Sequence, residues 1–270
     1  MNEHHPSVSH VSPLQLKGKK GIVLGVANHR SIAWAITKQL RQYGAEVGVT
    51  VLDERAEKKA QKLMDEHYSS QSFIQQCDVQ KNEDIRALVD KVSSRWQTLD
   101  FIVHSLAFAH LEDLQQDLSA CSKDGYQTAM EVSAYSLLAI IHACRPLLST
   151  HASIVTLSYL GAEIAIPSYG MMGPVKAALE AQVKYLAAEL GPQGTRVNVV
   201  SAGPLKTLAA SAIPGFRQSL KKMSETTPLK RGITHEEVAQ TVCFLCSPMS
   251  SGITGETIHV DAGRHAVREI

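Results

Sequence analysis

The sequence has no excess of charge of either sign and no long hydrophobic run. Its 27 Lys and Arg residues nearly balance 26 Asp and Glu residues, for a formal net charge of +1. Overall charge therefore favours neither a nucleic acid nor an acidic membrane as partner. No apolar stretch approaches the roughly 18 residues that a membrane-spanning helix needs. Residues 1–17 lack the apolar core of a secretory signal, so we expect a flexible polar arm on a cytoplasmic protein.

Cysteine is also scarce, and the odd count of five does not fit a framework of disulfide bonds. Cys243 and Cys246 form a CxxC pair, but no second ligand pair accompanies it and the surrounding apolar residues follow a helical period. We therefore expect these two thiols to pack in the core. His4, His5 and His10 have no Cys or carboxylate at ligand spacing, so no metal site is predicted in the arm.

After the arm, short β-branched runs alternate with longer amphipathic segments, which is the rhythm of parallel βαβ units. Strands are predicted at 21–26, 47–52, 72–79, 100–107, 153–159, 196–202 and 257–263. Helices are predicted at 31–43, 54–67, 82–97, 126–148, 169–190, 215–222 and 234–246. With 44% apolar and 20% charged residues, residues 18–270 suit one α/β domain, a doubly wound seven-stranded parallel sheet with helices on both faces.

The carboxyl ends of such strands lie along one edge, where a doubly wound fold binds its ligand. Leu106, Tyr159 and Ala202 end the fourth, fifth and sixth predicted strands, so we expect them to converge at this edge. Lys176 comes seven positions after Tyr169, close to two helical turns, which would place both side chains on one helical face. A phenol that can donate a proton beside a fixed cation is the outline of a reaction centre.

The loop after the first strand lacks the GxGxxG pattern of dinucleotide sites and keeps only Gly25. It leads directly into a predicted helix, whose free N–H groups and partial positive charge suit a pyrophosphate. Ser31 is the candidate N-cap and phosphate donor. This loop alone leaves two interpretations open, a dinucleotide site and a plain strand-to-helix turn.

Residues at two other strand ends favour the dinucleotide site. Asp78 and Val79 follow the third strand, where a carboxylate can hydrogen-bond an adenine ring, although a turn exposed to solvent is the alternative. Leu52 and Asp53 end the second strand, where an adenosine ribose would lie. An acid at that place favours a free 2′-hydroxyl and hence NADH over NADPH. Two arginines nearby in the sequence leave NADPH as an alternative cofactor.

These features fall within segments that resemble the enoyl-acyl-carrier-protein reductases of type II fatty-acid synthesis, a divergent branch of the short-chain dehydrogenase/reductase superfamily. The segments run in register from about Gly18 to Gly263: GVANHRSIAWAI, CDV, HSLAFA, LSYLGAEIAIPSYGMMGPVKAALEA, RVNVVSAGPLKTLAAS and GITGETIHVDAG. The most specific are the single-glycine loop, the SAGP-x-x-TLAAS block and the Tyr-x6-Lys spacing. The superfamily's usual Tyr-x3-Lys is absent, because Gly173 lies four positions after Tyr169.

The resemblance implies a Rossmann-type fold and a homotetramer that reduces trans-2-enoyl thioesters on acyl carrier protein with NADH. By position, Tyr169 resembles the proton donor to the thioester carbonyl, Tyr159 a second active-site tyrosine, and Lys176 the residue that holds the nicotinamide ribose. The resemblance implies cofactor contacts for Gly25, Ser31, Ile32, Leu52, Asp78, Val79, Leu106, Lys176, Leu205, Thr207, Leu208 and Ala209. It implies an acyl-pocket wall formed by Ala109, Met172, Ile213 and Phe216.

Two departures from the family pattern carry structural expectations. Leu52 stands where the family often has a Gln that contacts the ribose, and Asp53 is the candidate replacement. Pro174 lies inside the predicted catalytic helix and removes a backbone hydrogen bond unless it falls in the first turn. We therefore expect this helix to begin near Gly170 or Met171, or to be kinked there.

Two further features concern the cleft and its cover. Ser158 stands beside Tyr159, and because neighbouring side chains of a strand point to opposite faces, only one of the two should reach the cleft. Residues 204–230 are expected to form a lid over the acyl chain, whose basic residues either meet the acidic carrier protein or are solvated. Two other functions share the fold: reduction of a ketone or a specialised polyketide, and redox sensing without catalysis.

Overall fold

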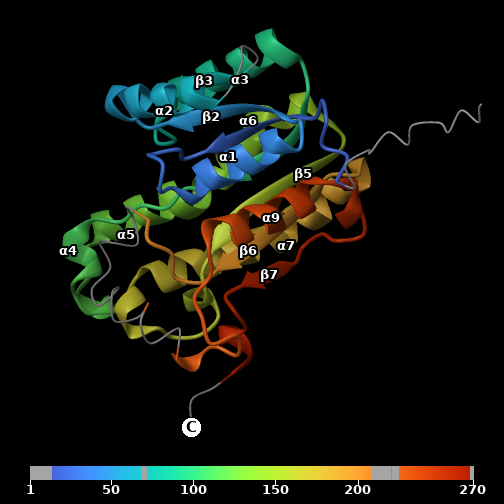
Figure 1. Cartoon of the computed structure of the whole chain (residues 1–270). Coiled ribbons are helices and arrows are strands. Elements are labelled where there is room, and N and C mark those ends of the chain that lie inside the picture. The colour runs from blue at the N-terminus through green and yellow to red at the C-terminus, as the bar shows by residue number, and fades with distance from the viewer. Residues whose placement is uncertain (1–13, 68–71, 208–219, 221–224, 268–270) are drawn as a thin grey trace, which may run out of the picture.

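A parallel sheet of seven strands in the order β3-β2-β1-β4-β5-β6-β7 forms the centre of the molecule (Figure 1). The computed structural model describes residues 14–67, 72–207, 220 and 225–267. The strands are β1 (Lys20–Leu24), β2 (Glu46–Val51), β3 (Phe73–Gln76), β4 (Leu99–His104), β5 (Leu148–Ser158), β6 (Arg196–Ala202) and β7 (Thr257–Val260). The order reverses between β1 and β4, which lie side by side, so the sheet is doubly wound as predicted.

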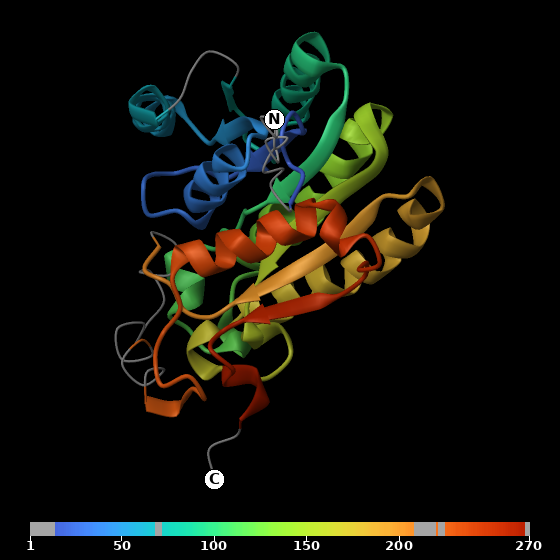
Figure 2. The ribbon, with the colours of Figure 1, turned by 45° about the vertical axis from the view of Figure 1, so that its right-hand side comes forward.

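Helices cover both faces of the sheet. They are α1 (Ile32–Gln42), α2 (Glu54–His67), α3 (Asn82–Trp96), α4 (Leu111–Leu114), α5 (Lys123–Met130), α6 (Ser136–Cys144), α7 (Met172–Leu190) and α9 (His235–Cys246). One apolar cluster joins the sheet to α1, α2 and α9, and Figure 2 shows α1 and α9 on the same side. A second cluster joins the other face to α3, α5, α6 and α7.

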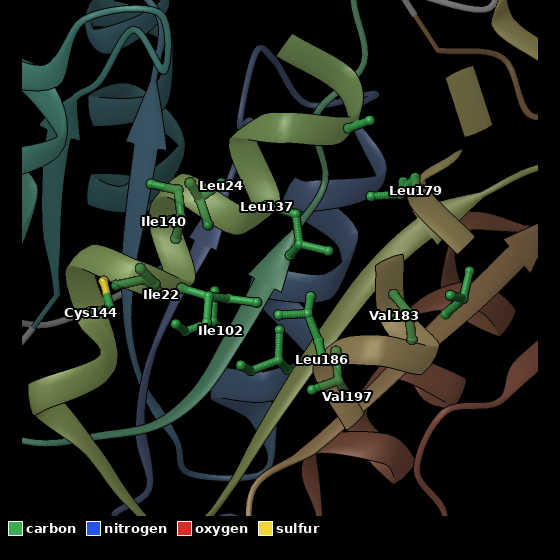
Figure 3. Packing of buried hydrophobic residues seen from close by; sticks show 14 of the residues in the cluster. Ile22, Leu24, Ile102, Leu137, Ile140, Cys144, Leu179, Val183, Leu186 and Val197 are labelled. Carbon is green, nitrogen blue, oxygen red and sulfur yellow. The ribbon is translucent and has the colours of Figure 1, made fainter. Parts of the chain in front are cut away.

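Alternation along the strands supplies both clusters. Ile22 and Leu24 of β1 enter the cluster of α6 and α7, whereas Val23 between them enters the opposite one. Figure 3 shows Leu137 of α6 and Leu186 of α7 packed in the cluster of α6 and α7 with residues of the sheet. Because both faces are buried, the strands are nearly continuous runs of apolar residues, which made them recognisable in the sequence.

The seven predicted strands are confirmed, but three predicted ranges end later than the observed strands by three residues, and three others by one or two. The ranges 72–79, 100–107 and 257–263 each run three residues past the ends of β3, β4 and β7. These residues leave the sheet and form loops at its carboxyl edge. Strand ends at a ligand edge therefore cannot be located from hydrophobicity alone.

Other boundaries also differ from the predictions. The helix predicted at 126–148 is composite: α5, a π-helical turn (Glu131–Tyr135), α6 and a 3₁₀ turn (Arg145–Leu147). The short α4 was not predicted, and the helix predicted at 215–222 lies, except for Leu220, outside the described residues. The domain begins before Gly18, because Leu16 is fully buried in the cluster of α1 and α9. No helix in the described part of the chain has the length and apolarity to cross a membrane.

A buried histidine ties the centre of the sheet to α6. The His104 side chain, at the end of β4, contacts the Thr156 hydroxyl of β5 at 2.9 Å through Nδ1 and the Ser136 hydroxyl of α6 at 2.8 Å through Nε2. Burial, together with the smaller effect of nearby Lys176, lowers the pKa of His104 from 6.5 to about 3. The ring therefore stays neutral, as a bridge between three elements at the carboxyl edge.

This neutral histidine predicts acid sensitivity. The unfolded chain takes up a proton near pH 6.5 and the folded chain only near pH 3, so stability present above pH 6.5 is lost as the pH falls through that window. Between pH 7 and pH 5 this loss amounts to about 2 kcal/mol. In urea unfolding, His104→Gln should flatten the pH dependence, while His142→Gln, on the exposed face of α6, should not. Equal slopes in both variants would contradict this account.

Candidate active site

The loops after β1 and β4 meet where the strand order reverses. Gly25 adopts φ +92°, and a Cβ there would lie 2.4 Å from the Ser105 carbonyl oxygen and 2.9 Å from the Leu106 side chain. Its N–H donates to the Thr50 hydroxyl of β2 at 3.2 Å. Glycine is therefore required at this point both by its backbone conformation and by the close approach of the second loop.

The next residues build the amino end of α1. Ser31 is the N-cap: its hydroxyl accepts from the Trp34 N–H at 3.3 Å and donates to the Asn28 carbonyl at 2.7 Å. The first turn of α1, all of it described, has no acidic residue that would neutralise the positive end of the helix. Ile32 packs against the cluster of α1 and α9. A glycine cradle next to an unneutralised helix end fits the pyrophosphate of a dinucleotide.

The ends of β2 and β3 continue this edge. Leu52 is 64% exposed, and the carboxylate of neighbouring Asp53 accepts from the Ala56 N–H at 2.7 Å, which caps α2. Asp78 accepts from the Gln80 N–H at 3.1 Å, and Val79 packs against the cluster of α3. An exposed apolar residue and two carboxylates thus line the side of the edge that lies beyond Gly25.

Lys176 of α7 is buried under the ends of β4 and β5. The side chain is 4% exposed, and Nζ donates to the Leu157 carbonyl at 2.9 Å and to the Leu106 carbonyl at 3.3 Å. Burial lowers the pKa of Lys176 to about 8, and the Glu180 carboxylate opposes that shift. An ammonium group has three N–H donors, and among the described residues only two of them have partners, which leaves the third for a ligand at the edge.

The two tyrosines meet just after the strand end whose Leu157 carbonyl accepts from Lys176. The rings of Tyr159 and Tyr169 pack edge to face with centroids 4.8 Å apart. Burial raises the pKa of both phenols above the ordinary value. Both hydroxyl groups are therefore protonated at neutral pH and can act as hydrogen-bond donors.

Tyr169 does not lie on α7, contrary to the prediction of a shared helical face with Lys176. It ends a 3₁₀ turn (Pro167–Tyr169), Gly170 follows at φ +51°, and α7 begins at Met172 with Met171 as its N-cap. The expected start near Gly170 or Met171 is close to the observed one, and Pro174 falls in the first turn, where it costs no hydrogen bond. The turn, rather than helical periodicity, brings the phenol to the edge.

Four other predicted site residues lie in the described part of the chain, two after β6 and two in or against the cluster of α6 and α7. Leu205 is buried after β6, and the Thr207 N–H donates to its carbonyl at 2.8 Å. Met172 is buried in the cluster of α6 and α7, and Ala109 packs against the same cluster. The remaining four predicted contacts lie outside the described residues: Leu208, Ala209, Ile213 and Phe216.

Three residues of this site were not found from the sequence. Gly161 packs against the ring of Tyr169, Thr50 holds Gly25, and Glu180 accepts a hydrogen bond from the Ser158 hydroxyl. The last contact agrees with the expectation that Ser158 and Tyr159 point apart. One signal was present: Glu180 comes four positions after Lys176, so the two share a face of α7.

Comparison with known proteins decides the family. A family model described as enoyl-(acyl carrier protein) reductase matches residues 25–265. The chain belongs to this enoyl reductase family. An enoyl-acyl-carrier-protein reductase (NADH) of Nostoc sp. is 46% identical over 253 residues, which cover 93% of this chain and 97% of the relative. The NADPH-type enzyme of Staphylococcus aureus is 42% identical over 255 residues, covering 94% and 100%.

A solved enoyl reductase structure has the same fold. The Bacillus cereus enoyl-acyl carrier protein reductase, solved with NADP+ and indole naphthyridinone, superimposes with a TM-score of 0.92 at 40% identity, covering 94% of this chain and 99% of that one. The family assignment therefore rests on sequence and on structure, and it confirms the resemblance stated above.

The contact between Gly161 and Tyr169 predicts a sharp intolerance. A Cβ at Gly161 would lie 2.4 Å from the Tyr169 ring, so Gly161→Ala should displace the phenol and cost about 1–3 kcal/mol of folding stability. Gly252→Ala is the matched control, because its Cβ would meet nothing within 4 Å. Urea unfolding measures the free energy of unfolding, and near-ultraviolet circular dichroism reports on the packing of the tyrosine ring. Indistinguishable variants would show that the ring can move freely.

Proposed function

We propose that this enoyl reductase transfers a hydride from NADH to the β-carbon of a trans-2-enoyl thioester carried by acyl carrier protein, the last reductive step of fatty-acid elongation. The observation that carries the proposal is the pairing of Tyr159 with Tyr169 just after the strand end that buried Lys176 contacts, at the same carboxyl edge as Gly25. NADH supplies the hydride when bound. The protein supplies orientation and a proton donor.

Tyr169 is the proposed donor to the thioester oxygen. Hydride addition at the β-carbon places negative charge on this oxygen as an enolate, and a neutral phenol stabilises it by hydrogen bonding. The raised pKa of Tyr169, caused chiefly by burial, keeps the proton on the phenol until charge develops. Tyr159 packs edge to face against this ring and limits its orientation.

Lys176 is proposed to hold the nicotinamide ribose with its remaining N–H donor. The Leu157 and Leu106 carbonyls fix the ammonium group from the protein side. Ser31 and Gly25 are proposed to hold the pyrophosphate, with Ile32 and Leu106 beside it. Contacts to the rest of the dinucleotide are proposed for Leu52, Asp78, Val79, Leu205, Thr207, Leu208 and Ala209.

NADH is proposed over NADPH because of Asp53. Its carboxylate stands at the end of β2 and would repel a 2′-phosphate while accepting a hydrogen bond from a 2′-hydroxyl. Relatives of similar identity differ on this point, with an NADH enzyme in Nostoc sp. and an NADPH enzyme in S. aureus. The chain's own residues at this place, rather than family membership, therefore carry the proposal.

Ala109, Met172, Ile213 and Phe216 are proposed to line the acyl pocket. The lid proposed at residues 204–230, with Arg217, Lys221 and Lys222 for carrier-protein contact, lies largely outside the described residues. A homotetramer and a cytoplasmic location remain predictions of the sequence analysis.

Loss of the phenol proton tests the chemistry. Tyr169→Phe should lower kcat by about 10²- to 10⁴-fold, because acid catalysis is lost, while NADH affinity measured by calorimetry stays unchanged. The decay of NADH absorbance with a crotonyl thioester gives the rate. Tyr185→Phe is the matched control, since Tyr185 lies on α7 and is 80% exposed. Absence of turnover by the wild type with every enoyl thioester in a panel would sink the proposal.

Cofactor choice is tested at Asp53. Asp53→Ser keeps a side chain that can cap α2 but removes the charge that opposes a 2′-phosphate, so kcat/KM for NADPH should rise about tenfold relative to NADH. Asp124→Ser, at the exposed first turn of α5, should leave the ratio unchanged. If the ratio of kcat/KM for NADPH to that for NADH is unaltered in Asp53→Ser, other residues determine the preference for NADH.

A further inference from the structure

Glu180 connects the strand that leads to Tyr159 with the helix that carries Lys176. Its carboxylate accepts a hydrogen bond from the Ser158 hydroxyl, and Ser158 is the last residue of β5. One residue earlier, the Leu157 carbonyl accepts from Lys176 Nζ at 2.9 Å. Two consecutive residues of the strand end are thus joined to α7 at positions one turn apart, since Lys176 and Glu180 are four residues apart.

The same carboxylate lies one helical turn from the buried ammonium group on the same face of α7 and is within electrostatic range of it. Burial lowers the pKa of Lys176 to about 8, and the attraction of Glu180 works against this shift. Without Glu180 the loss of the proton would move toward neutral pH, where the ammonium group is needed to donate to the ribose. Ser158, which is 6% exposed, fixes the carboxylate from the side of the strand.

Ionisable groups of other elements also face this pair. Burial raises the pKa of Glu180, the Ser158 hydrogen bond lowers it, Glu163 raises it, and His259 of β7 and Lys176 lower it. His259 itself contacts the Glu163 carboxylate at 2.6 Å. Neutral His104 lies within electrostatic range of Lys176, and Tyr169 lies within electrostatic range of Glu180.

We propose that Glu180 is a positioning residue of the reductase, which holds Lys176 in its protonated form and, through Ser158, fixes the strand end from which Tyr159 projects. The role of the ammonium group toward the ribose rests on the proposed function. The electrostatic effect of Glu180 on Lys176 does not rest on it, so this effect can be tested without cofactor or substrate.

Direct titration of Lys176 is the first test. In protein with lysine labelled by ¹³C at Cε, the Lys176 resonance, assigned by its absence in Lys176→Arg, should titrate near pH 8. In Glu180→Gln, which keeps an oxygen that can accept from Ser158, the midpoint should fall by about one pH unit. Glu189→Gln is the control, because Glu189 lies on the same helix but pairs with Arg145 at the surface. An unchanged midpoint in Glu180→Gln would overturn the proposal.

The kinetic test separates charge from position. In Glu180→Gln, KM for NADH should rise several-fold at pH 8 and little at pH 6.5, because only the charge of Lys176 is affected. Ser158→Ala keeps the charge, so the Lys176 midpoint should stay near that of the wild type while kcat falls and KM for NADH holds. A Ser158→Ala enzyme with normal kcat would overturn the positioning role.

The enoyl reductase activity and the role of Glu180 can be tested separately. If the wild type reduces no enoyl thioester, the proposed function is wrong, while the titration of Lys176 in Glu180→Gln still decides the role of Glu180. If Glu180→Gln does not fold, Glu180→Asp replaces it. The shorter acid keeps the charge near Lys176, so its midpoint should remain within a few tenths of a unit of the wild type; a fall as large as that expected for the loss of charge would overturn the proposal.

Discussion

A buried ammonium group is the constraint on which the carboxyl edge of the sheet depends. Taking a lysine out of water costs several kcal/mol unless polar partners replace the lost hydration. Here the partners of Lys176 are the Leu157 and Leu106 carbonyls and, through charge, Glu180. The ends of β4 and β5 must therefore lie close to α7, and the loops that leave these ends are positioned by the same requirement.

The doubly wound order supplies the other half of the site. Because β1 and β4 are neighbours, the loops after them must pass each other within a few ångströms, and Gly25 is the residue that permits the passage. The amino end of α1 then faces the same edge as the two tyrosines. Backbone geometry thus joins the part of the site proposed to bind the cofactor to the part that carries the tyrosines. His104 bridges β4, β5 and α6 at the same edge.

Much of the fold was predictable from the sequence, because strands buried on both faces are apolar throughout and helices carry a clear periodicity. The site was predictable only as a set of residues. Spacing placed Tyr169 on a helix with Lys176, whereas Gly170 at φ +51° puts it in a separate turn. Glu180 was missed because an acid four residues after a lysine is equally typical of a solvated helix face, and only burial distinguishes the two cases.

The separation of Tyr169 from α7 affects how the enzyme tolerates change. Substitutions on the exposed face of this long helix alter its surface without passing through the backbone that orients the phenol. The short turn from Pro167 to Gly170 and the glycine opposite the ring hold that orientation instead. We therefore expect substitutions to be tolerated on the exposed face of α7, while the reaction constrains the turn ahead of the helix and the face of α7 that carries Lys176 and Glu180.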